Sequence, residues 1–347
     1  SRINKLIINM KYTNYKYLLK SRPHGMPTND CWEYVSESID TLGSNELIIR
    51  NEFLSIDPYM RGRMNEGKSY APPVQIGEIM TGETVGVVVE SNSKKFNVGD
   101  KVCVHMGWQS YTKCKDSEIS LIRVPETNLP LSLFLGTLGM PGRTAYYGLN
   151  RVGKPKAGDT VVVSAASGAV GSVVGQLAKI YGCRVIGVAG GPEKKSYVKN
   201  TLGFDECIDY KNEDISRLLK EYCSTGIDIY FENVGGELSR HVAQNLNKGA
   251  RVPICGFISK YNSTDIMNEE TPFHVFGNLN PKPEHRFFVV REWMNEFEKT
   301  THILMKHVED GSIKYRETIV NGLENAPNAL NDVLSGKNFG KQLIKIN

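Results

Sequence analysis

A run of small residues at positions 165–171 has the spacing of a turn that binds phosphate groups. It reads Ala-Ala-Ser-Gly-Ala-Val-Gly, the pattern G-x-G-x-x-G with alanine in the first glycine position. Small side chains let backbone N–H groups approach a pyrophosphate, and the start of a helix favours its negative charge. Because an apolar strand is expected before the run, over 160–164, and a helix after it, over 170–181, we predict dinucleotide binding; a turn with small residues only for packing is the alternative. The residues expected at the pyrophosphate are Ala166, Gly168, Ala169, Val170 and Gly171.

The residues after the second expected strand indicate which dinucleotide is bound. An NAD site usually has Asp or Glu at the end of this strand, where the carboxylate holds the ribose 2′-hydroxyl. Here the strand at 184–188 is followed by Ala-Gly-Gly, with Gly190 as the first glycine, and no carboxylate occurs before Glu193. A Lys-Lys pair then begins at Lys194. A missing anion and two added cations suit a 2′-phosphate, so we predict NADP(H); lysines on an exposed helix face are the alternative.

The elements that position these turns lie between about residues 133 and 310, where short apolar runs alternate with helical patterns. Such alternation is typical of βαβ units and a parallel sheet, whose ligands bind at the carboxyl ends of the strands. Asn233 follows one of these strands, and Cys255 and Gly256 end the next, so we expect all three at that edge, the latter two beside the nicotinamide. Further strands are expected at 206–210, 228–233 and 249–255, and helices at 193–202, 215–223 and 237–246.

The chain before residue 130 has a different pattern. Short β-type runs at 46–50, 84–90 and 101–105 are separated by Gly, Pro and Asn, which predicts a mostly antiparallel β domain. The first 20 residues have too short an apolar run for a signal peptide and are interpreted as a first strand. After residue 311, strand-like segments at 312–320 and 341–347 enclose a helix that starts near residue 325, which suggests a return to the first domain.

The bulk properties of the sequence exclude several classes of protein. The 347 residues favour two domains, and 40% hydrophobic with 23% charged residues is the balance of a soluble globular chain. The net charge of +4 is spread out, without a run of five like charges, so neither nucleic acid nor a membrane surface is expected as a partner. No apolar stretch reaches the roughly 18 residues of a spanning helix, and the cytosol is the expected location. Seven widely spaced cysteines without a C-x-x-C pair are expected to be reduced thiols.

Six segments together make the chain recognisable. It resembles the medium-chain dehydrogenase/reductase superfamily along nearly its whole length, and within it the zinc-independent leukotriene B4 dehydrogenase/prostaglandin reductase and alkenal double-bond reductase family. The resemblance implies an α/β fold: a GroES-like, mostly antiparallel β domain over 1–132, a Rossmann domain with a doubly wound parallel sheet over 133–310, and a return to the first domain over 311–347. It also implies a homodimer. The matching segments are FLSIDPYMR at 53–61, GTLGMPGRTAYYGL at 136–149, SAASGAVGSVVG at 164–175, ENVGG at 232–236, GFISKYN at 256–262 and NFGK at 338–341.

Zinc-dependent members of this superfamily have a catalytic Cys and a catalytic His in the first domain. Their G-H-E-x-x-G pattern corresponds to residues 81–86, where the histidine position is Gly82, and the cysteine position falls near Ser55. We therefore expect no metal. Without zinc an alcohol lacks its usual Lewis acid, which argues against alcohol oxidation. An α,β-unsaturated aldehyde or ketone suits such a site better, because hydride addition to its β-carbon needs only a donor for the developing enolate oxygen.

The resemblance also assigns roles to single residues. Tyr261, in GFISKYN, corresponds to the family tyrosine near the substrate and the nicotinamide ribose, and its phenol can donate a hydrogen bond at neutral pH. Lys194 and Tyr210 correspond to positions that contact the 2′-phosphate, and Asn338 to an asparagine that contacts cofactor phosphate. Tyr59 is a candidate for the substrate cleft, with core packing as the alternative.

Three functions therefore remain open at this point. The first is NADPH-dependent reduction of the carbon–carbon double bond of enals and enones. The second is an NADPH:quinone oxidoreductase, which uses a similar cofactor geometry. The third is a protein that binds the nucleotide without turnover, against which the intact GFISKYN segment argues weakly.

Overall fold

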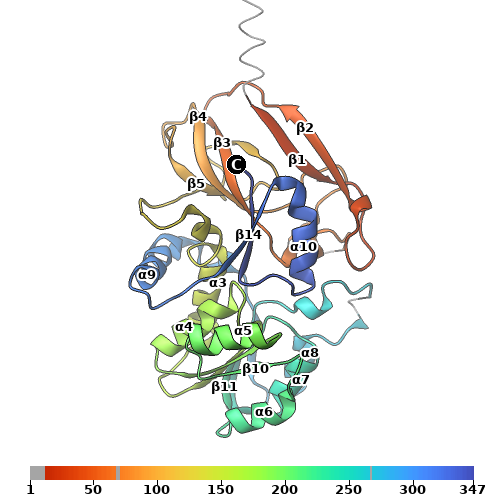
Figure 1. Cartoon of the computed structure of the whole chain (residues 1–347), viewed down its shortest axis with the longest axis vertical. Coiled ribbons are helices and arrows are strands. Elements are labelled where there is room, and N and C mark those ends of the chain that lie inside the picture. The colour runs from red at the N-terminus through yellow and green to blue at the C-terminus, as the bar shows by residue number, and fades with distance from the viewer. Residues whose placement is uncertain (1–11, 68–70, 266–267) are drawn as a thin grey trace, which may run out of the picture. The chain divides into compact units, whose positions relative to one another are not determined.

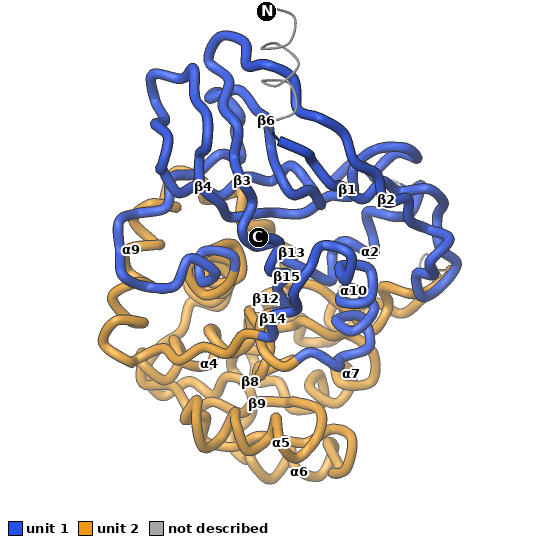
Figure 2. The backbone as a smooth tube through the Cα atoms, turned by 45° about the horizontal axis from the view of Figure 1, so that its top comes forward, with its two compact units in different colours: residues 1–135, 318–338, 342–347 blue, residues 136–317, 339–341 orange. Residues whose placement is uncertain are grey.

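The computed structural model describes residues 12–67, 71–265 and 268–347, and the chain forms two compact units (Figure 2). Unit 1 comprises Ser1–Leu135, Thr318–Asn338 and Gln342–Asn347, and unit 2 comprises Gly136–Glu317 and Phe339–Lys341. The units divide at residue 135, three residues beyond the boundary expected at 132. The chain leaves unit 2 after residue 317 rather than 310, and residues 339–341 group with unit 2.

Unit 1 is built on antiparallel strands. One sheet has the order β14-β15-β3-β4-β5-β7, with β6 also paired to β3, and β1 and β2 form a separate pair. The elements of unit 1, some of which are labelled in Figure 1, are β1 (Thr13–Leu19), η1 (Asn29–Cys31), β2 (Trp32–Ser38), β3 (Glu46–Ser55), α2 (Tyr59–Arg63), β4 (Thr84–Ser91), β5 (Lys101–Val104), β6 (Tyr111–Lys115), β7 (Ile122–Arg123), η2 (Leu131–Leu135), β14 (Glu317–Asn321), η8 (Leu323–Asn325), α10 (Ala326–Leu334) and β15 (Lys341–Lys345).

The C-terminal return completes the core of unit 1. Strand β15 pairs antiparallel with β3, with Leu343 opposite Ser55. Apolar residues of α10, including Leu330, are buried in one cluster with Leu54 of β3. Figure 1 shows this blue C-terminal segment beside red and orange strands from the start of the chain. The last 30 residues therefore close a core that the N-terminal part begins.

Unit 2 is the alternating part of the chain. Its elements are α3 (Met140–Tyr147), η3 (Gly148–Gly153), β8 (Thr160–Val163), α4 (Gly171–Ile180), β9 (Arg184–Ala189), α5 (Pro192–Ser196), η4 (Tyr197–Thr201), β10 (Glu206–Asp209), α6 (Ile215–Tyr222), β11 (Ile227–Phe231), α7 (Glu237–Ala243), β12 (Leu246–Ile254), η5 (Ile258–Lys260), α8 (Pro272–Gly277), β13 (Glu284–Phe287), η7 (Val290–Glu296) and α9 (Phe297–Glu309).

The parallel sheet of unit 2 has the strand order β10-β9-β8-β11-β12-β13. This is the 3-2-1-4-5-6 order of a doubly wound dinucleotide-binding sheet, and the chain reverses direction across the sheet between β8 and β11. The residues of β8 are all buried because helices cover both faces of such a sheet. Ligands bind beside the carboxyl ends of the strands at this switch point, so the following residues of β8, β9, β11 and β12 decide the function.

Several predicted boundaries differ from the structure. The helix expected over 237–246 ends at Ala243, and the strand expected over 46–50 continues to Ser55. Two further differences have local reasons. The helix expected over 193–202 is α5 followed by a wider turn, η4, in which Leu202 N–H bonds to the carbonyl of Tyr197 five residues earlier. The strand expected over 249–255 begins already at Leu246, where polar residues and a glycine conceal the strand pattern. Of the first strand expected in residues 1–20, Thr13–Leu19 is β1, and residues 1–11 lie outside the described part.

Within the residues that the structure describes, no helix is both long and apolar enough to cross a membrane.

Candidate cofactor and active site

The glycine-rich turn joins β8 to α4 at the switch point of the sheet. Ala165 has a left-handed backbone with φ +47°, and Gly168 N–H bonds to the carbonyl of Ala165 at 3.0 Å. A Cβ atom on Gly171 would lie 2.3 Å from that same carbonyl oxygen, so the turn can close only over a glycine. Ala166 N–H bonds to the carbonyl of Val188 and ties the turn to the end of β9. The sequence-predicted residues Ala166 to Gly171 are thus gathered at the start of α4, where a helix favours an anion.

Gly190 follows the end of β9 and packs against a tyrosine that follows the neighbouring strand β10. A Cβ atom on Gly190 would lie 2.8 Å from the hydroxyl oxygen of Tyr210, so the phenol ring lies against the glycine backbone. Tyr210 itself is half exposed, at 49%, directly after β10. Gly191 has φ +99° and donates its N–H to Asp209 at 2.8 Å. Gly190 and Tyr210, which were predicted from separate features of the sequence, are therefore in direct contact.

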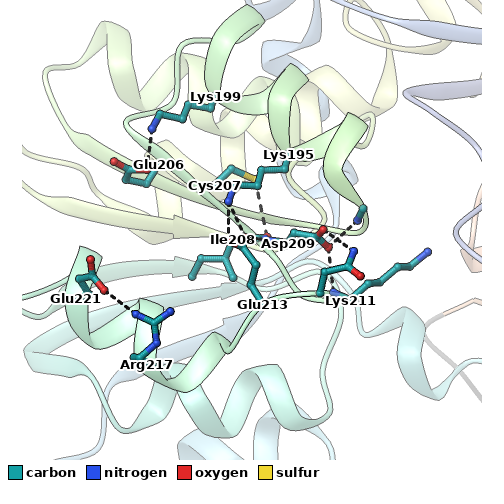
Figure 3. Close-up of polar contacts among 12 residues, drawn as sticks. Lys195, Lys199, Glu206, Cys207, Ile208, Asp209, Lys211, Glu213, Arg217 and Glu221 are labelled. Atoms are coloured by element: carbon teal, nitrogen blue, oxygen red, sulfur yellow. Dashed lines mark hydrogen bonds and ion pairs between the residues drawn. The ribbon is translucent and has the colours of Figure 1, made fainter.

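Asp209 is a carboxylate at this edge that the sequence analysis missed. It is 2% exposed and ends β10, beside β9 (Figure 3). Burial alone would raise its pKa, but hydrogen bonds from the Asn212 side chain and from the Gly191 and Lys211 N–H groups outweigh it, so the pKa lies below its ordinary value. Both carboxylate oxygens of Asp209 thus accept hydrogen bonds from the protein. Asp209 therefore stabilises the turn at Gly191 and is not available to bind a ribose hydroxyl.

The two neighbouring lysines of α5 have different surroundings. Lys195 forms an ion pair with Glu213 at 2.7 Å, as Figure 3 shows. This ion pair offsets the charge of Lys195. Lys194 is half buried, and burial together with the nearby charge of Lys211 lowers the pKa of its ammonium group. Figure 3 shows the Lys211 side chain extending away from the Asp209 contacts. The positive charges of Lys194 and Lys211 repel each other near the ends of β9 and β10. This arrangement suits a phosphate dianion, because its negative charge would offset the repulsion.

Aromatic residues support Lys194 from the other side. Its Nζ lies 5.9 Å from the centre of the Phe339 ring, and Arg316 stacks on that ring with its Cζ at 3.6 Å. Tyr197 packs edge-on against Phe339 with 5.2 Å between ring centres. Gly340, with φ +77°, allows Lys341 N–H to reach the carbonyl of Arg316, because a Cβ there would lie 2.2 Å from that oxygen. Asn338 comes immediately before this segment and groups with unit 1, whereas Phe339 groups with unit 2.

Asn233 lies across the switch point from the glycine-rich turn. Its backbone N–H donates to Ser164 Oγ at 2.8 Å, and its side-chain Nδ2 donates to the Ser164 carbonyl at 2.8 Å. Ser164 is the residue after β8, so these bonds join the ends of β8 and β11. The side chain of Asn233 is thereby fixed at the edge where the sequence predicted it.

Tyr261 follows η5 in the loop after β12. A Cβ atom on Gly256 would lie 2.4 Å from the phenol oxygen, so the hydroxyl group rests on the glycine backbone. Phe257 N–H donates to the same oxygen at 3.2 Å. The phenol is therefore held at the carboxyl end of β12, beside Cys255 and Gly256, as the sequence predicted. Burial raises the pKa of the Cys255 thiol to about 12, which does not favour the thiolate that a nucleophilic cysteine needs.

Tyr59 lies in unit 1 and is partly buried against its core. Its hydroxyl is 3.1 Å from His105 Nε2, which is also 3.1 Å from Thr81 Oγ1. The sequence analysis gave no role to any histidine, and spacing alone offers no signal for His105, because its partners are 46 and 24 residues away. The contact gives Tyr59 a polar partner in addition to its packing.

The positions of zinc ligands in related dehydrogenases are filled differently here. Ser55 donates to Asp57 at 2.5 Å. A Cβ atom on Gly82 would lie 2.9 Å from the Trp108 indole, so a histidine side chain would require the indole to move. The described residues contain no group of three or more His, Cys, Asp and Glu side chains that is arranged to hold a metal ion.

Two family models match the chain: the N-terminal domain of oxidoreductase over residues 15–122 and the zinc-binding dehydrogenase over residues 169–286. The second match lies within unit 2, away from Ser55 and Gly82 in the sequence. With the fold, these matches define the class as a medium-chain dehydrogenase/reductase.

Relatives along the whole chain narrow the class. The chain is 41% identical to the NADPH-dependent curcumin reductase of Escherichia coli (strain K12), covering 97% of this chain and 98% of that protein. It is 40% identical to the 2-alkenal reductase (NADP(+)-dependent) of Nicotiana tabacum, covering 96% and 98%. The crystal structure of CurA in complex with NADPH from Vibrio vulnificus is 44% identical, with a TM-score of 0.89, covering 96% and 99%. The chain belongs to the zinc-independent alkenal/prostaglandin reductase family, which confirms the predicted family and fold class.

Proposed function

We propose that this protein uses NADPH to reduce the carbon–carbon double bond of α,β-unsaturated aldehydes and ketones. The observation that carries the proposal is the Tyr261 phenol, held on Gly256 at the carboxyl end of β12. The relatives support it, since two of them are named as reductases of curcumin and of 2-alkenals, and both names include NADPH or NADP(+).

The residues of unit 2 fit NADP(H). The glycine-rich turn, from Ala166 to Gly171, offers backbone N–H groups at the start of α4 to the pyrophosphate. Lys194 supplies the cation and Tyr210 the hydroxyl donor for the 2′-phosphate beside Gly190, where no ribose-binding carboxylate extends. Asn233, Cys255 and Gly256 are assigned to the nicotinamide end. Asn338, which groups with unit 1, is assigned to a cofactor phosphate from its family position alone.

The protein's own contribution to the reaction is positioning and polarisation. When bound, the nicotinamide supplies a hydride to the β-carbon, and the double-bond electrons move so that an enolate forms. The Tyr261 hydroxyl donates a hydrogen bond to the carbonyl oxygen as this charge develops. The Phe257 N–H that bonds to the phenol oxygen makes the phenol a stronger donor, because hydrogen bonds in a chain polarise one another. A proton then adds to the α-carbon, from Tyr261 or from water, and the saturated carbonyl compound leaves.

The remaining elements of the proposal concern surroundings and assembly. Tyr59, with its hydroxyl next to His105, lines the substrate side in unit 1. The protein works as a homodimer in the cytoplasm, acts on a small molecule, and needs neither nucleic acid nor a membrane. Size-exclusion chromatography with light scattering tests the assembly, and a monomer at all concentrations would contradict it.

A substrate panel separates this function from its alternatives. NADPH oxidation is followed at steady state with trans-2-nonenal, 4-hydroxynonenal and a simple quinone. We expect turnover with both enals at a higher kcat/KM than with the quinone. A preference for the quinone would identify a quinone oxidoreductase, and NADPH binding without any turnover would identify a nucleotide-binding protein.

A further inference from the structure

We propose that Glu232, a fully buried residue, is the positioning residue that holds Tyr261 in its catalytic place. The inference rests on the proposed function, in which Tyr261 is the donor to the carbonyl oxygen. It concerns how the protein fixes that donor within unit 2.

The carboxylate of Glu232 binds the turn that follows β11. It is 0% exposed, and its Oε2 accepts the Val234 and Gly235 N–H groups, each at 3.2 Å. The Tyr230 hydroxyl donates to Oε2 at 2.5 Å, and the Ser239 hydroxyl donates to Oε1. One side chain therefore anchors the turn to β11 and to the start of α7.

The turn that Glu232 binds is hydrogen-bonded to the loop that contains Tyr261. Ile258 N–H donates to the carbonyl of Asn233 at 3.2 Å. Ser259 donates twice to the carbonyl of Val234, from its N–H at 3.0 Å and from its hydroxyl at 2.6 Å. The segment that leads to Tyr261 is thus bonded to the two residues that follow Glu232.

Glycine permits this close approach. Gly235 has φ +81°, and a Cβ atom there would lie 2.9 Å from the Cβ of Phe257. Phe257 is the residue whose N–H bonds to the Tyr261 hydroxyl. The turn and the tyrosine loop are therefore in close contact at Gly235 and Phe257, so a shift of one should move the other.

The nature of the Glu232 contacts argues against a role in packing alone. No lysine, arginine or histidine forms an ion pair with Glu232 among the described residues, and its donors are hydroxyl and backbone N–H groups. Burial without a counter-charge raises the pKa of this carboxyl group despite its hydrogen bonds. An apolar side chain would fill the space at a lower desolvation cost, so the acceptors are the property that the site needs.

The experiment compares substitutions that keep or remove these acceptors. Glu232→Gln keeps an oxygen for the Val234 and Gly235 N–H groups, and the Ser239 hydroxyl can accept from the new amide. Glu232→Met fills a similar volume without an oxygen acceptor. Ser259→Ala removes a single bond at the exposed end of the network, and we expect it to leave the protein folded even if Glu232→Met does not fold.

Each substitution is measured alone and together with Tyr261→Phe, using NADPH and trans-2-nonenal. We expect kcat to fall about tenfold for Glu232→Met and about threefold for Ser259→Ala, and to stay within about twofold for Glu232→Gln. In the Tyr261→Phe background none of the three should lower kcat further, because the donor that they position is already absent. Amide hydrogen exchange of residues 256–263 in the ligand-free protein should rise in Glu232→Met and Ser259→Ala but not in Glu232→Gln.

Two outcomes would overturn the inference while leaving the proposed function intact. One is that the losses in kcat multiply with that of Tyr261→Phe. The other is that Ser259→Ala and Glu232→Met leave both kcat and the exchange of 256–263 unchanged. If the unsubstituted enzyme does not turn over enals, the proposed function fails instead, whereas the exchange measurement still reports whether Glu232 holds the loop.

Discussion

The two ends of the candidate site are held by different kinds of interaction. At the ends of β9 and β10, the surroundings of Lys194 contain charged side chains, among them the exposed Lys211 and Arg316 and the partly exposed Lys195–Glu213 pair. At the ends of β11 and β12, Tyr261 depends on backbone N–H groups and on a buried carboxylate that forms no ion pair within the described part of the chain. The first end suits recognition of a charged group by attraction. The second suits a donor that must stay in one place while charge develops on the substrate.

The glycine-rich turn serves both ends, so breaking it should have the largest effect. We expect Gly171→Ala to raise the Kd of NADPH and of NADH equally, by about thirtyfold or roughly 2 kcal/mol, because the new Cβ meets the Ala165 carbonyl. Titration calorimetry with both cofactors measures this. Gly62→Ala is the matched control, since nothing lies within 4 Å of its Cβ position. An effect on NADPH alone would show that the turn does not bind the shared pyrophosphate.

Lys194→Ala should affect only the end of the site at β9 and β10. The unsubstituted protein is expected to bind NADPH at least about tenfold tighter than NADH, or roughly 1.4 kcal/mol, and the substitution should remove most of this preference. The NADPH affinity should also become less sensitive to salt, because a screened attraction is lost. Lys199→Ala is the control, as Lys199 is paired with Glu206. Equal Kd values for the two cofactors before any substitution would rule out the 2′-phosphate role.

Tyr261→Phe should affect only the end of the site at β11 and β12. We expect kcat with an enal to fall about tenfold, since the lost bond strengthens only in the transition state and a ribose hydroxyl or water can partly substitute. The NADPH Kd should stay within about twofold, which separates this variant from Lys194→Ala. Full kcat would show that the phenol is not the polarising donor, and loss of cofactor binding would make its role structural.

Metal removal should have the smallest effect, because neither end of the site is expected to use a metal. Activity should survive prolonged treatment with EDTA or phenanthroline. Elemental analysis of the purified protein provides the control. Stoichiometric zinc whose removal abolishes activity would contradict the interpretation of Ser55 and Gly82.

The two ends also differ in how far the sequence predicts them. Gly190 and Lys194 were predicted because glycines and lysines leave a local signature next to a strand, whereas Tyr210 was assigned only by resemblance to the family. The structure places Tyr210 against Gly190. Asp209 was missed because its position at the end of a strand conceals that its carboxylate is bonded to the next turn. Phe339 and Arg316 meet from segments separated by 23 residues, which no local pattern indicates.

At the other end, Tyr261 was found by resemblance and Asn233 from its place after a strand. In the sequence, Glu232 stands out only as the first residue of the ENVGG segment at 232–236. Its importance depends on four donors that converge on one buried carboxylate, and burial and convergence are properties of the folded chain. The fold itself was predictable because the alternation of strands and helices is local, whereas the exact start of β12 depended on sheet pairing that overrides weak strand residues.

The most direct test of the account follows the transferred hydride. The enzyme is supplied with NADPH carrying deuterium at both C4 positions and with trans-2-nonenal, and the product is analysed by mass spectrometry and NMR. The account predicts nonanal with a single deuterium on C3, the former β-carbon, and an intact aldehyde. An unsaturated alcohol with deuterium on C1 would contradict it, because the hydride would then have been delivered to the carbonyl carbon.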